Sequence, residues 1–306
     1  MRINRIMAII IVAIIALSII SYEVYMRYYY KIPLRISTTT SLYATGLLDA
    51  IADTFSQKYP NVDVQFIAVG SGAALQLAAR GDVDGVLVHA PDLEKQYIDS
   101  GIIMNQTIFA YNYFVIVGPI NDPAGVSEVS DPIEAMKQIY NACEQGLTFF
   151  ISRGDNSGTH QRELLLWKLA GLDPKGKEWY LETGSGMAET LIMANEKLAY
   201  TISDIGTFLK FSGDGKIPNL KAFEMKSPIL INIYSAYAVN PAKYPDVKYN
   251  LVIKFIEFLV SEEGQNIIAN FCVEKYSQPL FYPVDQRSEE LRNYWEWLVN
   301  ISGGYE

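Results

Sequence analysis

The chain contains few of the residues that most often perform chemistry or bind metals in proteins. Its 306 residues include two cysteines and two histidines. Cys143 and Cys272 have no second cysteine or histidine at metal-ligand spacing, which excludes the usual zinc and redox motifs. We therefore expect two separate buried thiols, while the sequence leaves a disulfide between them open.

Positive charge is also scarce. Lys and Arg number 25 against 34 Asp and Glu, which gives a net charge of −9 at pH 7. Proteins that bind nucleic acid neutralise phosphates with basic side chains, so we expect no nucleic-acid partner. A small anion is not excluded, because a desolvated site can hold it with local dipoles and a few charges. The content of 50% hydrophobic and 19% charged residues is typical of a folded globular protein.

Catalytic and nucleotide-binding motifs are missing as well. No Gly-x-Ser-x-Gly elbow follows a strand-like run, and Gly70-Ser71-Gly72 lacks that spacing. No Gly-x-x-x-x-Gly-Lys-Ser/Thr loop occurs, so ATP binding is not expected. No cluster of carboxylates or histidines suggests a metal site. The sequence therefore predicts a protein that is not an enzyme and has neither a cofactor nor a metal ion.

Residues 1–33 have the pattern of an export signal or a membrane anchor. Arg2 and Arg5 precede an almost wholly apolar run, Ile6–Ile20. No small-x-small cleavage site follows, and five tyrosines suited to the membrane–water interface come next, at positions 22, 25, 28, 29 and 30. We predict an uncleaved anchor that holds the body on the outer face of the cytoplasmic membrane. A cleaved signal peptide, with a secreted or periplasmic body, is the alternative.

From Leu34 onward, short β-rich runs alternate with helical patterns. The runs are Leu34–Ile36, Val62–Val69 and Val86–Val88, with helical patterns between them at 46–58 and 73–79. This alternation predicts an α/β fold, in which helices pack on a parallel sheet.

Two longer extended runs, Phe109–Pro119 and Ile229–Asn240, flank a further α/β block. A block inserted in this way forms a second lobe, and the ligand binds in the cleft that closes between the lobes. We predict that lobe I comprises residues 34–114 and 236–306 and that lobe II comprises residues 115–235. The aromatic tail, with Trp295 and Trp297, is expected to pack on the body.

Three segments rich in serine, threonine and glycine each lead into a helical pattern: 37–41, 70–74 and 152–160. A helix start attracts anions, because its first amides have no partner within the helix and the helix dipole is positive there. Each segment alone is explained equally well by a helix cap or a tight turn. Together they predict donors that converge on one anion, with four consecutive hydroxyls supplied by Thr38–Ser41.

The third segment is the most specific of the three. Arg153 is the only cation among them, and a guanidinium offers an anion a charged and bidentate set of donors. Asp155 stands two residues further on and can orient Arg153 by an ion pair. We expect His160 to stabilise this loop. His89, which follows the run Val86–Val88, is expected to be structural or, alternatively, a donor beside the cleft.

Several of these segments resemble those of the TupA-type tungstate-binding proteins, a family of type II periplasmic binding proteins. The resemblance extends from Leu34 to Pro283 and is carried by the segments 38–41, 69–75, 86–91, 114–119, 151–160 and 179–184. It implies a two-lobed periplasmic-binding-protein fold. It also implies that the protein delivers tungstate, or molybdate, to the permease and ATPase subunits of an ABC importer.

The resemblance also implies where the oxyanion contacts lie. They would be Thr38, Thr39, Ser41, Ser71, Arg153, Ser157, Gly158 and Thr159. Supporting or weaker candidates are Asp155, His89, His160 and Ser185.

The nearest alternative is a phosphate-binding component of an ABC importer, whose anion loop is similar. Phosphate keeps a proton at neutral pH, so its site needs an acceptor such as an aspartate. The phosphate family places an aspartate where this chain has His89. A site made only of donors favours a fully deprotonated oxyanion, because a donor that faces an O–H group leaves both unsatisfied. Tungstate is therefore our first hypothesis, and an exported hydrolase that acts through Ser71 or Ser157 is the third.

Overall fold

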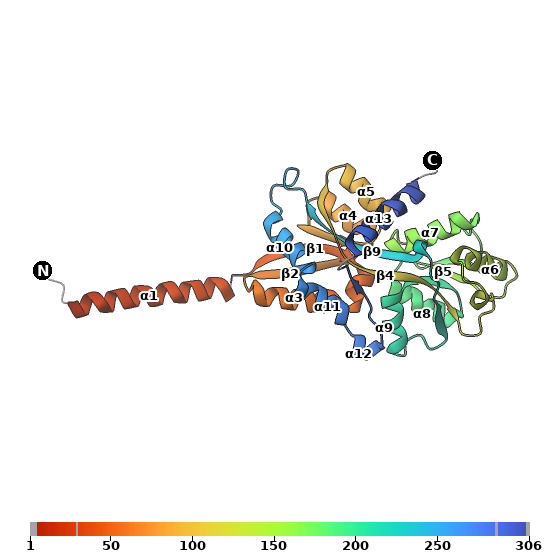
Figure 1. The fold of residues 1–306 in the computed structure, drawn as a ribbon, viewed down its shortest axis with the longest axis horizontal. Coiled ribbons are helices and arrows are strands. Elements are labelled where there is room, and N and C mark those ends of the chain that lie inside the picture. Colours follow the sequence, from red (N-terminus) through yellow and green to blue (C-terminus); the bar gives the residue numbers. More distant parts are fainter. Residues whose placement is uncertain (1–4, 29, 285–286, 304–306) are drawn as a thin grey trace.

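The computed structural model describes residues 5–28, 30–284 and 287–303 (Figure 1). Arg2 and Tyr29 of the predicted anchor lie outside the described residues. Helix α1, Arg5–Tyr28, extends away from the body (Figure 1). Its segment Met7–Met26 is long and apolar enough to cross a membrane, and 0% of it is buried. A signal sequence near an N-terminus has the same properties, so α1 is consistent with both an uncleaved anchor and a cleaved signal peptide.

The main sheet has eight strands, and six of them follow the order β10-β4-β9-β3-β1-β2. β1 pairs in parallel with β2 and β3, whereas β9 runs antiparallel to both β3 and β4. This part of the sheet is the base of the first lobe. Its strands are β1 (Ile32–Thr39), β2 (Val62–Val69), β3 (Gly85–Val88), β4 (Ile103–Pro119), β9 (Ile231–Val239) and β10 (Tyr282–Pro283).

Helices cover both faces of this first part of the sheet. On one face Leu34, Phe55 and Phe255 belong to a buried layer that packs α2, α3, α10 and α11 onto the strands. On the other face Leu75 and Val86 belong to a layer that includes α4 and α5. These helices are α2 (Thr40–Thr45), α3 (Leu47–Lys58), α4 (Ser71–Ala79), α5 (Pro91–Asp99), α10 (Tyr249–Leu259) and α11 (Glu262–Asn270).

The second lobe is built where β4 continues past its last partner in β9. The segment 114–119 of β4 pairs with β7 and β8, and a bridge between Phe150 and Tyr200 places β5 beside β7. β5 also pairs in parallel with β6. The strands are β5 (Phe150–Ser152), β6 (Tyr180–Glu182), β7 (Thr201–Asp204) and β8 (Leu220–Phe223). The helices are α6 (Pro132–Glu144), α7 (Gly158–Ala170), α8 (Met187–Lys197) and α9 (Ile205–Gly213), and a short helix η1 spans Val126–Glu128.

The exact boundaries of the two lobes stay a prediction. Strand pairing nevertheless indicates where the chain returns from the second lobe to the first. All of β9 pairs with β3 or β4 in the first lobe. We therefore propose that the chain returns to the first lobe before Ile231, near the short helix η2 (Pro228–Leu230), instead of at residues 235 and 236.

The C-terminal part packs on both lobes through α13 (Ser288–Gly303), which follows the short helix α12 (Val273–Tyr276). Trp295 is buried as expected, and its Nε1 donates to Glu94 on α5 at 2.8 Å. Trp297 is 38% exposed, so the expectation that it packs on the body is wrong. Two residues along a helix correspond to about 200° of rotation, which turns Trp297 away from the face that buries Trp295.

Two further expectations need correction. β1 continues through Thr39, which pairs with Val69 of β2, so Thr38 and Thr39 lie in a strand and not in a loop. Both cysteines are free, but only Cys143 is buried, since Cys272 is half-buried just after α11.

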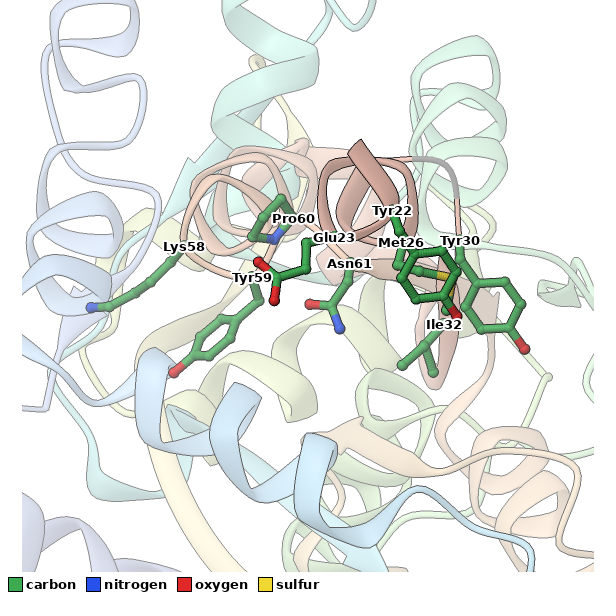
Figure 2. Close-up of a pocket in the computed structure, with 9 residues that line it drawn as sticks. All are labelled: Tyr22, Glu23, Met26, Tyr30, Ile32, Lys58, Tyr59, Pro60 and Asn61. Atoms are coloured by element: carbon green, nitrogen blue, oxygen red, sulfur yellow. The ribbon is translucent and has the colours of Figure 1, made fainter. Parts of the chain in front are cut away.

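A pocket lies where α1 meets the body (Figure 2). It is lined by residues of α1, of the connection from α1 to β1, of the start of β1, of the end of α3 and of the turn between α3 and β2: Tyr22, Glu23, Met26, Tyr30, Ile32, Lys58, Tyr59, Pro60 and Asn61. None of these residues belongs to the three predicted anion-binding segments, so this pocket is not the candidate site.

Candidate anion-binding site

Four helix N-termini come together between the lobes: those of α2, α4, α7 and α8. Thr39 caps α2, because its Oγ1 accepts from the amide of Leu42, and Ser157 caps α7 by accepting from the amide of His160. No side chain caps α4 or α8, which follow Gly70 and Gly186. Backbone N–H groups in these first turns have no partner within their helix and point outward as anion donors.

Two glycines allow the segments to approach one another. A Cβ on Gly158 would lie 2.5 Å from the carbonyl oxygen of His89, and one on Gly72 would lie 2.8 Å from Nδ2 of Asn156. The amide of Gly158 donates to Oγ of Ser71 at 3.2 Å. The second and third segments, predicted from the sequence to converge, are therefore in direct contact across the lobes.

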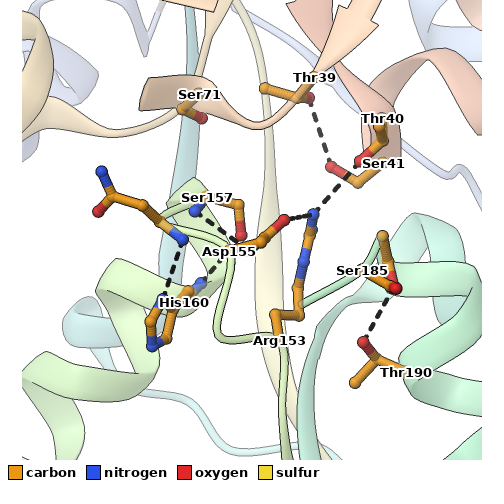
Figure 3. A network of polar contacts seen from close by, with 12 residues as sticks. Thr39, Thr40, Ser41, Ser71, Arg153, Asp155, Ser157, His160, Ser185 and Thr190 are labelled. Atoms are coloured by element: carbon orange, nitrogen blue, oxygen red, sulfur yellow. Dashed lines mark hydrogen bonds and ion pairs between the residues drawn. The ribbon is translucent and has the colours of Figure 1, made fainter. Parts of the chain in front are cut away.

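Arg153 lies at the centre of the site and is only 2% exposed (Figure 3). Its Nη2 donates to Oγ1 of Thr40 at 3.2 Å and to Oδ2 of Asp155 at 2.5 Å. Within the described part of the chain, Nε and Nη1 of Arg153 have no hydrogen-bond partner. A buried charge with two unsatisfied donors is costly, so the site is built to receive acceptor atoms from a ligand.

Two hydroxyls of the predicted set have the same property. Oγ1 of Thr38 and Oγ1 of Thr159 are buried and lack a hydrogen-bond partner among the described residues. Thr38 comes from β1 in the first lobe, and Thr159 comes from the first turn of α7 in the second. Buried hydroxyls without a partner among the described residues therefore occur in both lobes.

The supporting candidates have different places. His160 accepts a hydrogen bond from the amide of Asn156 through Nδ1 at 3.1 Å, so it holds the third loop together. Oγ of Ser185 donates to the carbonyl of Thr183 and is engaged within its own turn. Both oxygens of Asp155 accept hydrogen bonds from the protein, one from Arg153 and one from the amide of Ser157.

His89 is buried at the end of β3 and stacks on the ring of Tyr234 at 4.8 Å. Its Nδ1 lies 2.8 Å from Oδ1 of Asn232, and its Nε2 lies 3.4 Å from Oγ of Ser41. Burial lowers the pKa of His89 to about 4, against the raising effect of the hydrogen bond with Asn232. The ring is therefore neutral at pH 7.

Glu163 supports the loop that carries Arg153. It accepts hydrogen bonds from Oγ of Ser152 at 2.8 Å and from the hydroxyl of Tyr180 at 2.6 Å. Oγ of Ser152 in turn accepts from the amide of Gly154 at 3.2 Å. Burial raises the pKa of Glu163 to about 7, although these hydrogen bonds act to lower it.

Comparison with known proteins supplies the family. The PBP superfamily domain matches residues 32–263. Tungstate-binding protein TupA of Peptoclostridium acidaminophilum is 38% identical over 250 residues, which are 81% of this chain and 84% of the relative. The chain belongs to the TupA family of the PBP superfamily.

Solved structures agree with this assignment to the TupA family. The structure of the tungstate ABC transporter from Geobacter sulfurreducens is 46% identical, with a TM-score of 0.69, and the match covers 78% of this chain and 98% of that one. The tungstate-binding protein TupA from Desulfovibrio alaskensis G20 is 41% identical, with a TM-score of 0.68 and coverage of 82% and 98%. The predicted family and the predicted two-lobed α/β fold are confirmed.

Three residues that shape this TupA-family site were not among the predicted contact or supporting residues. They are Thr40, which bonds Arg153 from the other lobe, Asn232, which bonds His89, and Glu163, which holds Ser152. Thr40 lies within the run of four hydroxyls, which is the signal that could have included it. No sequence motif points to Asn232 or Glu163, because each bonds a side chain from another segment of the chain. Asn232 bonds His89, and Glu163 bonds Ser152.

The raised pKa of Glu163 predicts a pH-dependent stability. An unfolded glutamate has a pKa of about 4.3, so the folded protein binds more protons than the unfolded chain between that pH and about 7. The stabilisation is complete below pH ~4.3 and is lost as the pH rises through the folded-state pKa. We expect the wild type to lose about 1–3 kcal/mol of this contribution between pH 5 and pH 8, and Glu163→Gln to remove that loss.

Urea unfolding of both proteins at pH 5, 6, 7 and 8 measures the difference. The profile of Glu163→Gln is subtracted from that of the wild type, because His89 also contributes to both. The lowered pKa of His89 makes the free energy of unfolding rise with pH below pH ~6.5, which is opposite to the effect of Glu163. Exposed Glu257→Gln is the matched control and should leave the profile unchanged. Parallel profiles for the wild type and Glu163→Gln would contradict the assignment.

Proposed function

We propose that the protein is the extracytoplasmic solute-binding component of an ABC importer and that it captures tungstate. The observation that carries this proposal is the buried guanidinium of Arg153, whose Nε and Nη1 have no partner among the described residues. The unpaired hydroxyls of Thr38 and Thr159 support it. Relatives that are named for tungstate binding, at 38% and 41% identity, supply the identity of the anion.

The donor set favours a fully deprotonated oxyanion over phosphate. Each oxygen of Asp155 already accepts a hydrogen bond from the protein, one from Nη2 of Arg153 and one from the amide of Ser157, so its remaining lone pairs are weaker acceptors for the proton of monohydrogen phosphate. Tungstate and molybdate carry the same charge and the same tetrahedral set of acceptors. The site described here suits both, and the names of the relatives favour tungstate.

We infer that the protein binds its ligand without converting it. Ser71 and Ser157, the two serines of the hydrolase alternative, both accept hydrogen bonds from backbone amides. Ser41 has a histidine beside it, but Ser41 and His89 are each 1% exposed, which leaves little room for an attacking hydroxyl to reach an ester. The structures and curated relatives named above are binding or transport proteins.

We also propose that α1 remains attached and anchors the body at the outer face of the membrane. Support comes from the missing small-x-small cleavage site after the apolar run Ile6–Ile20 and from the tyrosines that follow it, which suit the membrane–water interface. The permease and the ATPase of the importer are the expected protein partners.

Replacing Arg153 tests the function directly. Arg153→Ala should weaken tungstate binding by about 100-fold or more, since hydrogen bonds to charged groups are each worth about 1.5–3 kcal/mol. Isothermal titration calorimetry measures it, with molybdate, sulfate and phosphate as competing ligands. Arg80→Ala is the matched control, because Arg80 is exposed and forms an ion pair with Asp82 on the surface.

Thermal unfolding of each variant separates a folding defect from a binding defect. Tight binding of phosphate together with no measurable binding of tungstate would identify phosphate as the ligand instead. Unchanged tungstate affinity in folded Arg153→Ala would remove Arg153 from the site.

The anchor is tested on the native protein. Intact-mass measurement of material extracted from membranes should give the full chain, because no cleavage site follows the apolar run. A mass that lacks the first 20 to 30 residues, from protein found free in the medium or periplasm, would establish cleavage instead.

A further inference from the structure

A chain of buried hydrogen bonds fixes the protonation pattern of His89. It begins at the carbonyl of Leu280, which can only accept, and Nδ2 of Asn112 donates to it at 3.1 Å. Oδ1 of Asn112 then accepts from Nδ2 of Asn232 at 2.8 Å. The side-chain oxygen of Asn232, Oδ1, lies 2.8 Å from Nδ1 of His89. Since that oxygen can only accept, Nδ1 of His89 carries a hydrogen.

The other ring nitrogen of neutral His89 is therefore a bare acceptor. Nε2 lies 3.4 Å from Oγ of Ser41, so the Ser41 hydroxyl donates to it. Oγ of Ser41 is in turn 3.4 Å from Oγ1 of Thr39, which accepts from the amide of Leu42. In this arrangement the hydroxyl hydrogen of Ser41 is engaged by His89, and the hydroxyl of Thr39 donates to Oγ of Ser41.

A bound oxyanion competes for these protons. Ser41 has a single hydroxyl hydrogen, and a fully deprotonated oxyanion offers acceptors only. If Ser41 donates to the anion, the buried Nε2 of His89 loses its donor, which is costly. A hydrogen on Nε2 resolves the conflict, because N–H can then donate to Oγ of Ser41.

We propose that His89 takes up one proton when the oxyanion binds, so that Ser41 and Thr39 can turn their hydroxyls to the ligand. This proposal rests on the proposed oxyanion-binding function. The proton comes from the buffer: a new N–H bond forms at Nε2, the Ser41 and Thr39 hydroxyls rotate, and no bond of the ligand breaks. His89 acts through Ser41 and is a positioning residue.

The surroundings of His89 are consistent with a ring that charges only when the anion is present. Among the charged groups near His89, Arg153 and Arg162 oppose its protonation and Asp155 favours it. Asp92 of α5 lines the same small pocket as His89 and Arg162, and burial raises the pKa of its carboxyl. Arg162 is buried on α7, where it donates to the carbonyl of Ile229 and lies over the ring of Phe114.

The groups packed against His89 from the other elements carry no charge that would hold a proton on it. They are the Ser41 hydroxyl of α2, the ring of Phe114 on β4, Tyr234 and Asn232 of β9, and the backbone of Gly158 on α7. A dianion beside Ser41 outweighs the two arginines and raises the pKa of His89 from about 4.

Proton uptake is measured by calorimetric titration with sodium tungstate, in buffers of different ionisation enthalpy at pH 6, 7 and 8. We expect uptake that approaches one proton per tungstate as the pH falls, and an affinity that rises by up to tenfold per pH unit in that range. His89→Gln should abolish the uptake, since its amide oxygen can accept from Ser41 but cannot take a proton. Exposed Glu257→Gln on α10 is the control and should retain it.

The two histidines also give a direct readout on the wild type. Their ring signals, followed by NMR from pH 5 to pH 8, should show His89 titrating at higher pH with tungstate than without it. Tungstate binding with no proton uptake and an unshifted His89 would overturn this proposal and leave the oxyanion-binding function intact. No binding of tungstate at any pH would overturn both.

Discussion

The site depends on the burial of one positive charge between two lobes. Arg153 is 2% exposed, and its ion pair with Asp155 leaves no net charge. A dianion that enters this site must therefore be balanced by dipoles. The helices α4, α7 and α8, of nine to thirteen residues, each present roughly half a positive charge at the N-terminus. A proton on His89 supplies the remaining compensation next to Ser41.

The residues proposed to bind the ligand also connect the lobes. Arg153 of the second lobe bonds Thr40 of the first, and the amide of Gly158 bonds Ser71. A side chain at Gly158 would collide with the backbone carbonyl of His89 in the other lobe, so this contact requires a glycine. Together with α13, which packs on both lobes, these contacts hold the lobes in their relative position.

The sequence predicted the parts of the site whose chemistry is local. Arg153 and Asp155 are two residues apart, and their ion pair follows from that spacing. The link between Arg153 and Thr40 joins residues 113 positions apart and depends on how the lobes meet. The extent of β1 was missed because pairing with β2, and not local composition, carries the strand through Thr39. Trp297 was misplaced because composition does not reveal which face of a helix is buried.

His89 also refines the idea of a site made only of donors. While its ring is neutral, Nε2 draws the Ser41 hydroxyl inward and leaves an oxygen lone pair of Ser41 free to accept. A protonated oxyanion could donate to that oxygen and leave His89 uncharged, so the buried site would keep the full charge of the ligand. A fully deprotonated oxyanion instead brings a proton onto His89 and lowers the net buried charge by one. The preference for the deprotonated ligand thus arises from charge compensation at His89 as well as from the scarcity of acceptors.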